Sequence, residues 1–159
     1  MKIVIADSST LIVLLDTDNF SLLFKLFKEI TISQEVYSEI TQKIYNKKEL
    51  DSYIASNIIK VVSVEHDDRY NMLIKRLDKG EAESIALAKK LELPLIIDER
   101  KGRNIAKSLG IKIIGFVGII LKLLDKKIIS KNRALKIIKD AEENNFRLSD
   151  ELKNLIYNY

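Results

Sequence analysis

Cysteine is absent from this sequence of 159 residues, and proline and histidine occur only once each. Without cysteine the chain forms neither disulfides nor thiolate metal sites, which fits a reducing compartment. The single histidine, His66, lies in the polar stretch Glu65-His66-Asp67-Asp68-Arg69. We therefore interpret His66 as a surface residue and not as a catalytic base, and we do not expect zinc catalysis.

Long apolar runs are also missing. No uninterrupted apolar segment approaches the ~20 residues that are needed to cross a bilayer. The apolar beginning of the chain is broken by Asp7, Ser8, Ser9 and Thr10, and no small-residue cleavage site follows it, so it differs from a signal peptide. We expect a cytoplasmic protein with no targeting segment and no contact with a membrane.

Nothing in the sequence marks a domain boundary. There is no internal repeat or low-complexity tract, and Pro94 is the only proline. The length suits one domain, so we predict a single domain over 1–159 whose portion from about 116 to 159 is helical. The net charge of +4 favours a polyanionic partner, because Lys and Arg near phosphates release condensed counterions. The abundance of lysine, isoleucine and asparagine would equally follow from an AT-rich coding sequence.

Short apolar runs alternate with longer segments of helical period. Unbroken runs rich in β-branched residues are typical of strands covered on both faces. Strands that alternate with helices predict a three-layer α/β/α fold with a mainly parallel central sheet. The predicted strands are 3–6, 30–32, 59–64, 95–97 and 111–114. The predicted helical segments are 11–27 with an interruption near 17–19, 36–44 after a candidate cap at Ser33, 49–55, 67–77, 80–91, 103–109, 117–124, 131–143 and 150–157.

Four acidic residues occupy positions that such a fold brings together. Asp7 and Asp98 each follow a predicted strand directly, and parallel sheets place their sites beyond the carboxyl ends of the strands. Glu81 lies in the first turn of a predicted helix, where the helix dipole favours an anion. Glu39 lies beside the apolar stripe of its helix, from which a side chain can reach a neighbouring cleft.

Each of these acids also has an ordinary structural explanation. Asp7 could cap the helix that follows it, and Asp98 with Glu99 could cap the next one. Glu81 could only complement its helix dipole, and Glu39 could be solvated. Both explanations stay open for each residue taken alone, although four such acids together favour a shared site.

A shared site of this kind indicates divalent metal chemistry. Carboxylates a few ångströms apart repel one another, and a divalent cation removes that conflict. Mg²⁺ and Mn²⁺ prefer oxygen ligands, and such ions activate water and stabilise charge that develops on phosphorus. No histidine is required as a base.

Cationic residues flank the acid at the end of the fourth predicted strand. Arg100, Lys101 and Arg103 follow Asp98 closely. They could draw RNA phosphates toward the acids. They could equally balance the charge of Glu99 or form a partner surface.

Other phosphate chemistries fit less well. The segment Gly115-Phe116-Val117-Gly118 lacks the third glycine of a dinucleotide fingerprint, and no Walker-type GK[ST] sequence occurs. We interpret that segment as a tight turn into a helix. Haloacid-dehalogenase phosphatases need a second aspartate two positions after the first, where this chain has Ser9.

The order of these motifs resembles the PIN domain, specifically the PIN-like branch DUF3368, which is related to the toxins of toxin–antitoxin pairs. The most specific part of the resemblance is the GEAE helix start followed by IDERKGR. The resemblance runs nearly from end to end, over IADSSTLI at 5–12, ITISQEVYSEI at 30–40, DKGEAESIALAKKL at 78–91, LIIDERKGRNIAKSLGIKIIG at 95–115 and NFRLSDEL at 145–152. Ser33 departs from the pattern, since relatives often have proline there.

The resemblance implies a catalytic and metal-binding set of Asp7, Glu39, Glu81 and Asp98. Glu81 stands where many PIN domains carry aspartate. Ser8, Ser9 and Glu99 would support the set, with Ser8 and Ser9 orienting the first carboxylate or a metal-bound water. Arg100, Lys101 and Arg103 would contact RNA.

The implied activity is an endoribonuclease that uses Mg²⁺ or Mn²⁺ to hydrolyse RNA phosphodiesters, leaving 5′-phosphate and 3′-hydroxyl ends. The implied partners are RNA, a cognate antitoxin protein if the chain is a toxin, and a second copy in a homodimer. The alternative is a non-catalytic PIN-like module that binds nucleic acid or a regulatory protein.

Overall fold

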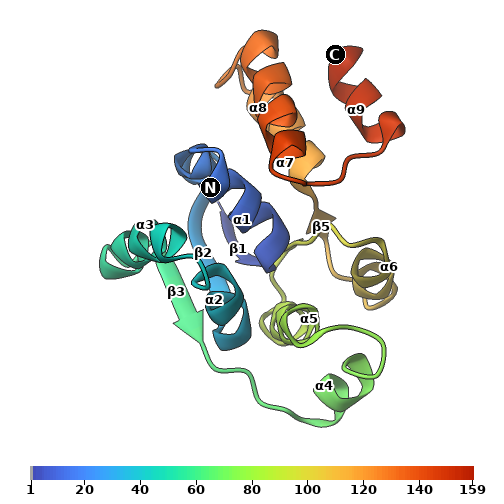
Figure 1. Ribbon diagram of the computed structural model, residues 1–159. Helices are drawn as coiled ribbons and strands as arrows, with labels where there is room; N and C mark the ends of the chain where they lie inside the picture. Colours follow the sequence, from blue (N-terminus) through green and yellow to red (C-terminus); the bar gives the residue numbers. More distant parts are fainter. Residues whose placement is uncertain (1) are drawn as a thin grey trace.

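A parallel five-stranded sheet forms the centre of the computed structural model, which describes residues 2–159 (Figure 1). The strand order is β3-β2-β1-β4-β5, and every neighbouring pair is parallel. The predicted parallel α/β fold is confirmed. The strands are β1 (Lys2–Ala6), β2 (Phe27–Ser33), β3 (Ile59–Val62), β4 (Leu95–Ile96) and β5 (Ile113–Ile114).

Side chains of the central strands alternate between two apolar clusters, because successive residues of a strand point to opposite faces. In β1, Val4 and Ala6 belong to one cluster and Ile5 belongs to the other. Around β4, Ile96 faces the first cluster, whereas Ile97 faces the second. Both faces are therefore covered, which explains why these strands are unbroken apolar runs in the sequence.

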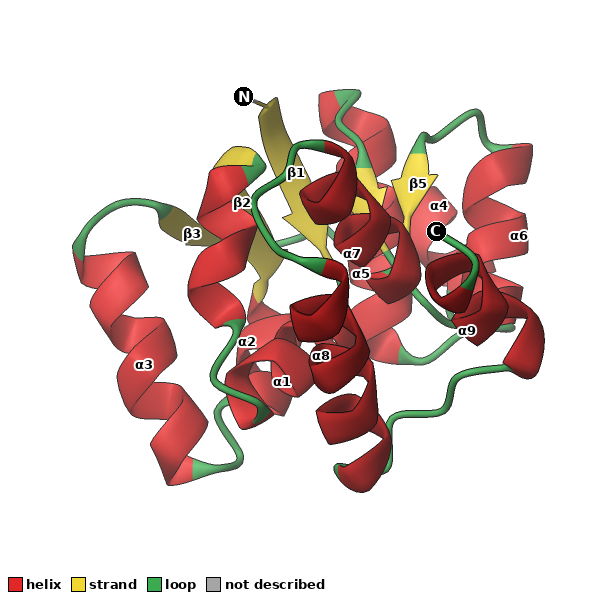
Figure 2. Cartoon of the chain, turned by 90° about the horizontal axis from the view of Figure 1, so that it is seen from above, coloured by secondary structure: helices red, strands yellow, loops and turns green. Residues whose placement is uncertain are grey.

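Helices cover the two faces of the sheet and make it the middle layer of three. The helices that pack mainly in the first cluster are α1 (Ser8–Asp16), the short 3₁₀ helix η1 (Phe20–Lys25), α2 (Gln34–Ile40), α3 (Ile44–Ala55), α7 (Phe116–Asp125), α8 (Lys131–Glu143) and α9 (Asp150–Tyr157). Those in the second cluster are α4 (Asp68–Leu73), α5 (Lys79–Leu91) and α6 (Arg100–Ser108). Figure 2 shows α7, α8 and α9 side by side on the first face.

Side-chain caps fix where several helices begin. Ser33 Oγ accepts a hydrogen bond from the Val36 N–H, so Ser33 caps α2 as predicted. Asp78 and Glu81 form a capping box at the start of α5. Gly110, with φ of +78°, follows the end of α6 in the left-handed region that glycine adopts without strain.

The predicted helical segment 36–44, whose apolar positions are Val36, Ile40 and Ile44, is wrong at its end. Helix α2 ends at Ile40, and Ile44 begins α3 with 74% of its surface exposed. The buried residue in that turn is the polar Asn46, whose amide donates to Asp16 Oδ1 at 2.9 Å. Because a polar side chain takes the inward position, hydrophobic spacing places the start of α3 five residues too late.

Residues 2–159 contain no helix with the length and apolar character of a membrane span.

Candidate metal centre

A cavity of about 330 Å³ lies beyond the carboxyl end of β1. The start of α1, α2 and α5 lie together there (Figure 1). Three of the four predicted acids, Asp7, Glu39 and Glu81, line this cavity, which we call the acid cavity. Its other lining residues are Ser8, Ser9, Arg76, Leu77, Asp78, Glu99 and Lys101.

Asp7 is held at the junction of β1 and α1. Its backbone N–H donates to Ile96 O at 2.9 Å, which ties the end of β1 to β4. Asp7 stands at the N-cap position of α1, yet its side chain makes no capping hydrogen bond. The carboxyl group is buried, and burial raises its pKa from 3.8 to about 7, with the charges of Glu39, Asp78 and Asp98 adding to the rise. Capping therefore does not explain this buried acid.

Glu39 reaches the acid cavity from α2, where the chain turns away from the end of β2. Its Oε2 accepts a hydrogen bond of 2.9 Å from Ser8 Oγ, so the buried serine fixes the glutamate. The predicted orienting role of Ser8 thus falls on Glu39, while Ser9 is exposed at the rim. Burial raises the pKa of Glu39, and the hydrogen bond from Ser8 partly opposes this rise.

Glu81 comes from the first turn of α5 and is buried beside Asp78. Its N–H donates to Asp78 Oδ1 at 2.9 Å, and its Oε1 accepts from the Asp78 N–H at 3.4 Å. Burial raises the pKa of Glu81 to about 8, and the neighbouring Asp78 carboxylate adds to the rise. Asp78 is thus a fifth acid of the cavity that sequence reasoning missed, although its spacing from Glu81 is that of a capping box.

Asp98 faces a groove beside the acid cavity and does not line the cavity itself. Its Oδ1 accepts from the Phe116 N–H at 2.8 Å, and its Oδ2 accepts from the hydroxyl of Thr10. Burial raises the pKa of Asp98, while these two hydrogen bonds and the nearby Arg103 oppose the rise. The structure therefore places three predicted acids in one cavity and the fourth next to it.

Three of the five glycines leave the space that these carboxylates occupy. An added Cβ would come within 3.0 Å of Glu81 Oε2 at Gly102 and within 2.9 Å of Asp98 Oδ1 at Gly115. At Gly80 a Cβ would overlap Glu39 Oε1. A larger residue at Gly80 would displace the Glu39 carboxylate, whereas at Gly102 and Gly115 it would first meet Ile97 and Arg103.

A sequence model described as a PIN domain, of the DUF3368 branch, matches residues 3–158. The chain belongs to the PIN-domain family. This confirms the resemblance that the motifs indicate. Proteins of this family are typically nucleases and generally use divalent metal ions.

Structural comparison also finds the PIN fold. A PilT N-terminus domain protein from the hyperthermophilic archaeon Sulfolobus solfataricus superposes with a TM-score of 0.53 at 18% sequence identity. The superposition covers 76% of this chain and 92% of that chain. At this identity the likeness concerns the fold alone. No curated protein matches the sequence.

In this PIN domain, three buried carboxylate oxygens at the acid cavity have no hydrogen-bond partner: Asp7 Oδ1, Glu39 Oε1 and Glu81 Oε2. Unpaired buried oxygens are costly, and a hard divalent cation is the natural partner for carboxylate oxygens. The donors present therefore fit Mg²⁺ or Mn²⁺.

The acids are nevertheless not arranged as a finished coordination sphere. Within residues 2–159, no three His, Asp or Glu side chains converge closely enough to hold a metal ion as they stand. Separate partners hold the carboxylates apart, since Ser8 binds Glu39, Asp78 binds Glu81, and Thr10 binds Asp98. The ready four-carboxylate site that the sequence predicts is therefore not formed, although three of its members share the cavity.

The predicted cationic residues take three different positions around the PIN-domain site. Lys101 lines the acid cavity, and Arg103 donates to Ile97 O at 2.9 Å beside Asp98. Arg100 is exposed on the same helix. Arg76, from the turn before α5, also lines the cavity and was missed by sequence reasoning, because nothing in its local sequence links it to the acids.

His66 lies outside the lining of the acid cavity, in agreement with its interpretation as a surface residue. Its Nε2 is 2.8 Å from the buried Glu83 Oε2, and its ring stacks on Tyr70 with centroids 3.7 Å apart. Glu83 Oε1 also accepts from the Glu35 N–H at 3.3 Å. His66 thus holds the segment after β3 against α5.

Proposed function

We propose that this PIN domain is a ribonuclease that depends on Mg²⁺ or Mn²⁺. The observation that carries the proposal is the set of three unpaired, buried carboxylate oxygens around one cavity. The pKa values of Asp7 and Glu81 are raised because both carboxylates are buried near other negative charges without a counterion, and a bound cation would supply that counterion.

Asp7, Glu39 and Glu81 are the residues that would hold the metal, and Asp98 would add its charge from the adjoining groove. A bound divalent cation would supply Lewis-acid activation of water and stabilisation of charge on the phosphate. The chain contributes the placement of the ligands: Ser8 fixes Glu39, the Asp78 backbone fixes Glu81, and Thr10 with the Phe116 N–H fixes Asp98.

RNA is the proposed substrate because cations border the acids. Lys101 and Arg76 line the acid cavity, and Arg103 lies beside Asp98. Lysine and arginine side chains position phosphate groups without reading the base sequence. Family resemblance supports an endonucleolytic cut that leaves 5′-phosphate and 3′-hydroxyl ends.

Cleavage of end-labelled single-stranded RNA tests the proposal. We expect cleavage with Mn²⁺ or Mg²⁺, and we expect it to disappear with EDTA and in Asp7→Asn, Glu81→Gln and Asp98→Asn. Glu143→Gln, on the exposed face of α8, is the matched control and should cleave like the wild type. Circular dichroism shows whether each variant is folded. Mn²⁺-dependent cleavage that persists in both aspartate variants contradicts the mechanism.

One observation favours a second function, a PIN-like module that binds RNA or a regulatory protein without cleaving it. Glu39, Glu81 and Asp98 each have a separate hydrogen-bond partner, and within the described chain no three acids converge on a common point. Under this alternative, Mn²⁺ would bind in an acid-dependent way and RNA would remain intact. The cleavage assay and a Mn²⁺ titration together separate the two functions.

The biological role and protein partners are further proposals. We propose a toxin restrained by a cognate antitoxin, which arrests growth when it is expressed alone. We also propose a homodimer. Leu152 and Leu155 of α9 are 41% and 50% exposed, whereas Ile119 and Ile120 of α7 are fully buried, so of these two helices α9 offers the apolar contact surface.

A further inference from the structure

A second surface of note lies at the opposite end of the sheet from the acid cavity. Two neighbouring cavities of about 400 and 450 Å³ are lined by residues at the amino ends of the strands. They have Lys2, Pro94, Ile111 and Lys112 in common, so they form one continuous depression. Lys2 begins β1, Pro94 precedes β4, and Lys112 precedes β5.

The charge of this depression is almost entirely positive. Five lysines line it against one acid, Glu92. Among residues 2–159, none of the five has a carboxylate within ion-pair distance. We call these residues the rear lysine surface: Lys2, Lys89, Lys107, Lys112 and Lys122.

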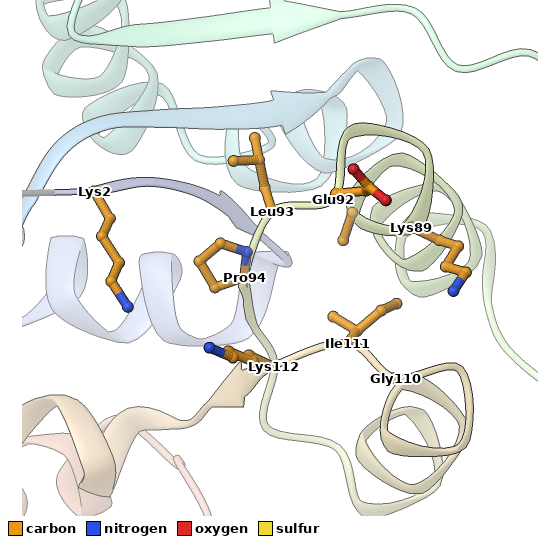
Figure 3. A pocket seen from close by; sticks show the side chains of 9 residues that line it. Lys2, Lys89, Glu92, Leu93, Pro94, Gly110, Ile111 and Lys112 are labelled. Carbon is orange, nitrogen blue, oxygen red and sulfur yellow. The ribbon is translucent and has the colours of Figure 1, made fainter.

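The lysines surround a small apolar floor. In Figure 3, Lys2 and Lys112 extend past Pro94 on the same side, and Lys89 lies across Ile111 from them. Lys89 Nζ donates to Leu109 O at 2.9 Å, so this cation is fixed by the backbone and not by an acid. Ammonium groups gathered without counterions favour a ligand that carries several negative charges.

Helix α6 connects the rear lysine surface to the acid cavity. Lys101 at its beginning lines the acid cavity, and Lys107 near its end lines the rear depression. The nine residues of α6 rise by about 13 Å, and the helix carries Arg100 and Arg103 as well but no acid. A row of positive charge therefore runs from one end of the sheet to the other.

We propose that the rear lysine surface binds the phosphodiester backbone of a single-stranded RNA that leaves the acid cavity along α6. This inference rests on the proposed ribonuclease function. A single strand suits this path, because duplexes are too stiff to follow the side of so small a protein. Among the described residues that line the depression, Phe27 is the one aromatic residue and it is 5% exposed, so we expect contacts to phosphates and not stacking with bases.

The test measures RNA binding in EDTA, where cleavage does not interfere. Fluorescence anisotropy would follow labelled single strands of about 4 and about 16 nucleotides, lengths that span the site sizes of single-strand grooves. The variant is Lys107→Gln/Lys112→Gln. The matched control is Lys48→Gln/Lys139→Gln, which removes two exposed lysines of α3 and α8 without ion pairs.

We expect the rear variant to bind the long RNA more weakly and to bind the short RNA like the wild type. Its log–log salt slope for the long RNA should be smaller by about 1.4, since each lost contact to a single strand removes about 0.7. The control should keep the wild-type slope. The proposal is overturned if Lys107→Gln/Lys112→Gln keeps the wild-type salt slope, or if it loses the same affinity for the short RNA as for the long RNA.

The failure of this proposal can be distinguished from the failure of the proposed ribonuclease function. If the protein binds long RNA through the rear lysine surface but cuts no RNA, the nuclease proposal alone fails. If it cuts the short RNA in Mn²⁺ while the rear variant keeps full affinity for the long RNA, the surface proposal alone fails.

Discussion

Ser8 Oγ donates a 2.9 Å hydrogen bond to Glu39 Oε2, which joins the start of α1 to α2 across the acid cavity. The bond satisfies one oxygen of a carboxylate whose other oxygen, Oε1, has no partner. Ser8 thereby orients the glutamate and leaves Oε1 for another ligand. The small residue after Asp7 is therefore a positioning residue for Glu39.

Removal of the Ser8 hydroxyl should weaken metal binding. In Ser8→Ala, Glu39 loses its fixed orientation, and partners that orient metal ligands typically contribute about 10- to 100-fold to affinity. We expect Mn²⁺ affinity, measured by calorimetry, to fall by about tenfold or more. Ser9→Ala is the matched control, because Ser9 is exposed beside the same cavity, and it should bind like the wild type. Equal affinities of both variants would refute the orienting role.

Gly80→Ala should separate stability from metal binding. Alanine suits a helix better than glycine by up to about 1 kcal/mol, so stability should be little changed. Its Cβ would overlap Glu39 Oε1, so Mn²⁺ affinity should fall. Gly110→Ala should lower stability, because φ there is +78°, and should leave Mn²⁺ affinity unchanged, because no atom lies within 4 Å of an added Cβ. Thermal unfolding and Mn²⁺ calorimetry check both variants, and unchanged metal affinity in Gly80→Ala would count against the site.

Stability without metal should fall as the pH rises from about 4 to 8. Burial raises the pKa of Asp7 to about 7 and that of Glu81 to about 8 in the folded protein. The unfolded chain therefore releases these two protons at a lower pH than the folded chain does. Stability is therefore fully present below the unfolded pKa values and is lost as the pH passes through the folded ones.

Asp7→Asn removes one of these ionisations and should raise metal-free stability at pH 8 by roughly 1–3 kcal/mol relative to wild type. At pH 4 the difference should be small. Urea unfolding in EDTA measures both values, with Glu143→Gln as a control that follows the wild type. The measured quantity is the difference in free energy of unfolding between Asp7→Asn and the wild type. If this difference is no larger at pH 8 than at pH 4, the burial of a costly charge at Asp7 is refuted.

Thr10→Val should shift the pH dependence of cleavage. The Thr10 hydroxyl lowers the pKa of Asp98 by donating to its Oδ2, so its loss should raise that pKa further. The acidic limb of the pH–rate profile should then move to higher pH, and Thr10→Ser should restore it. A uniform loss of activity with an unshifted profile would indicate a structural role only.

The sequence predicts most of the fold, because both faces of the sheet are covered. Unbroken runs such as Ile3–Ala6 and Leu95–Ile97 could be assigned as strands, and Ser33 could be assigned as a cap. Boundaries were less accurate where burial does not follow hydrophobicity. Helix α4 ends at Leu73, four residues before the predicted end, and the buried Leu77 packs from a turn.

The site is predictable only as far as strand ends define it. Asp7 and Asp98 follow strands, but the sequence gives no sign that Asp98 is drawn into a groove by the N–H of Phe116, which is distant in sequence. Asp78, Thr10 and Arg76 depend on tertiary contacts in the same way. Local spacing alone indicates the Asp78 cap, not its place in the acid cavity.

The central claim is that the buried, unpaired carboxylate oxygens of Asp7, Glu39 and Glu81 in the acid cavity hold a divalent cation. Calorimetric titration of Mn²⁺ at pH 8 into the wild type, Glu81→Gln and Glu143→Gln tests it most directly. We predict saturable binding by the wild type and Glu143→Gln and a loss of binding in Glu81→Gln. Binding to Glu81→Gln as tight as to the wild type, or no binding to either, would contradict the account.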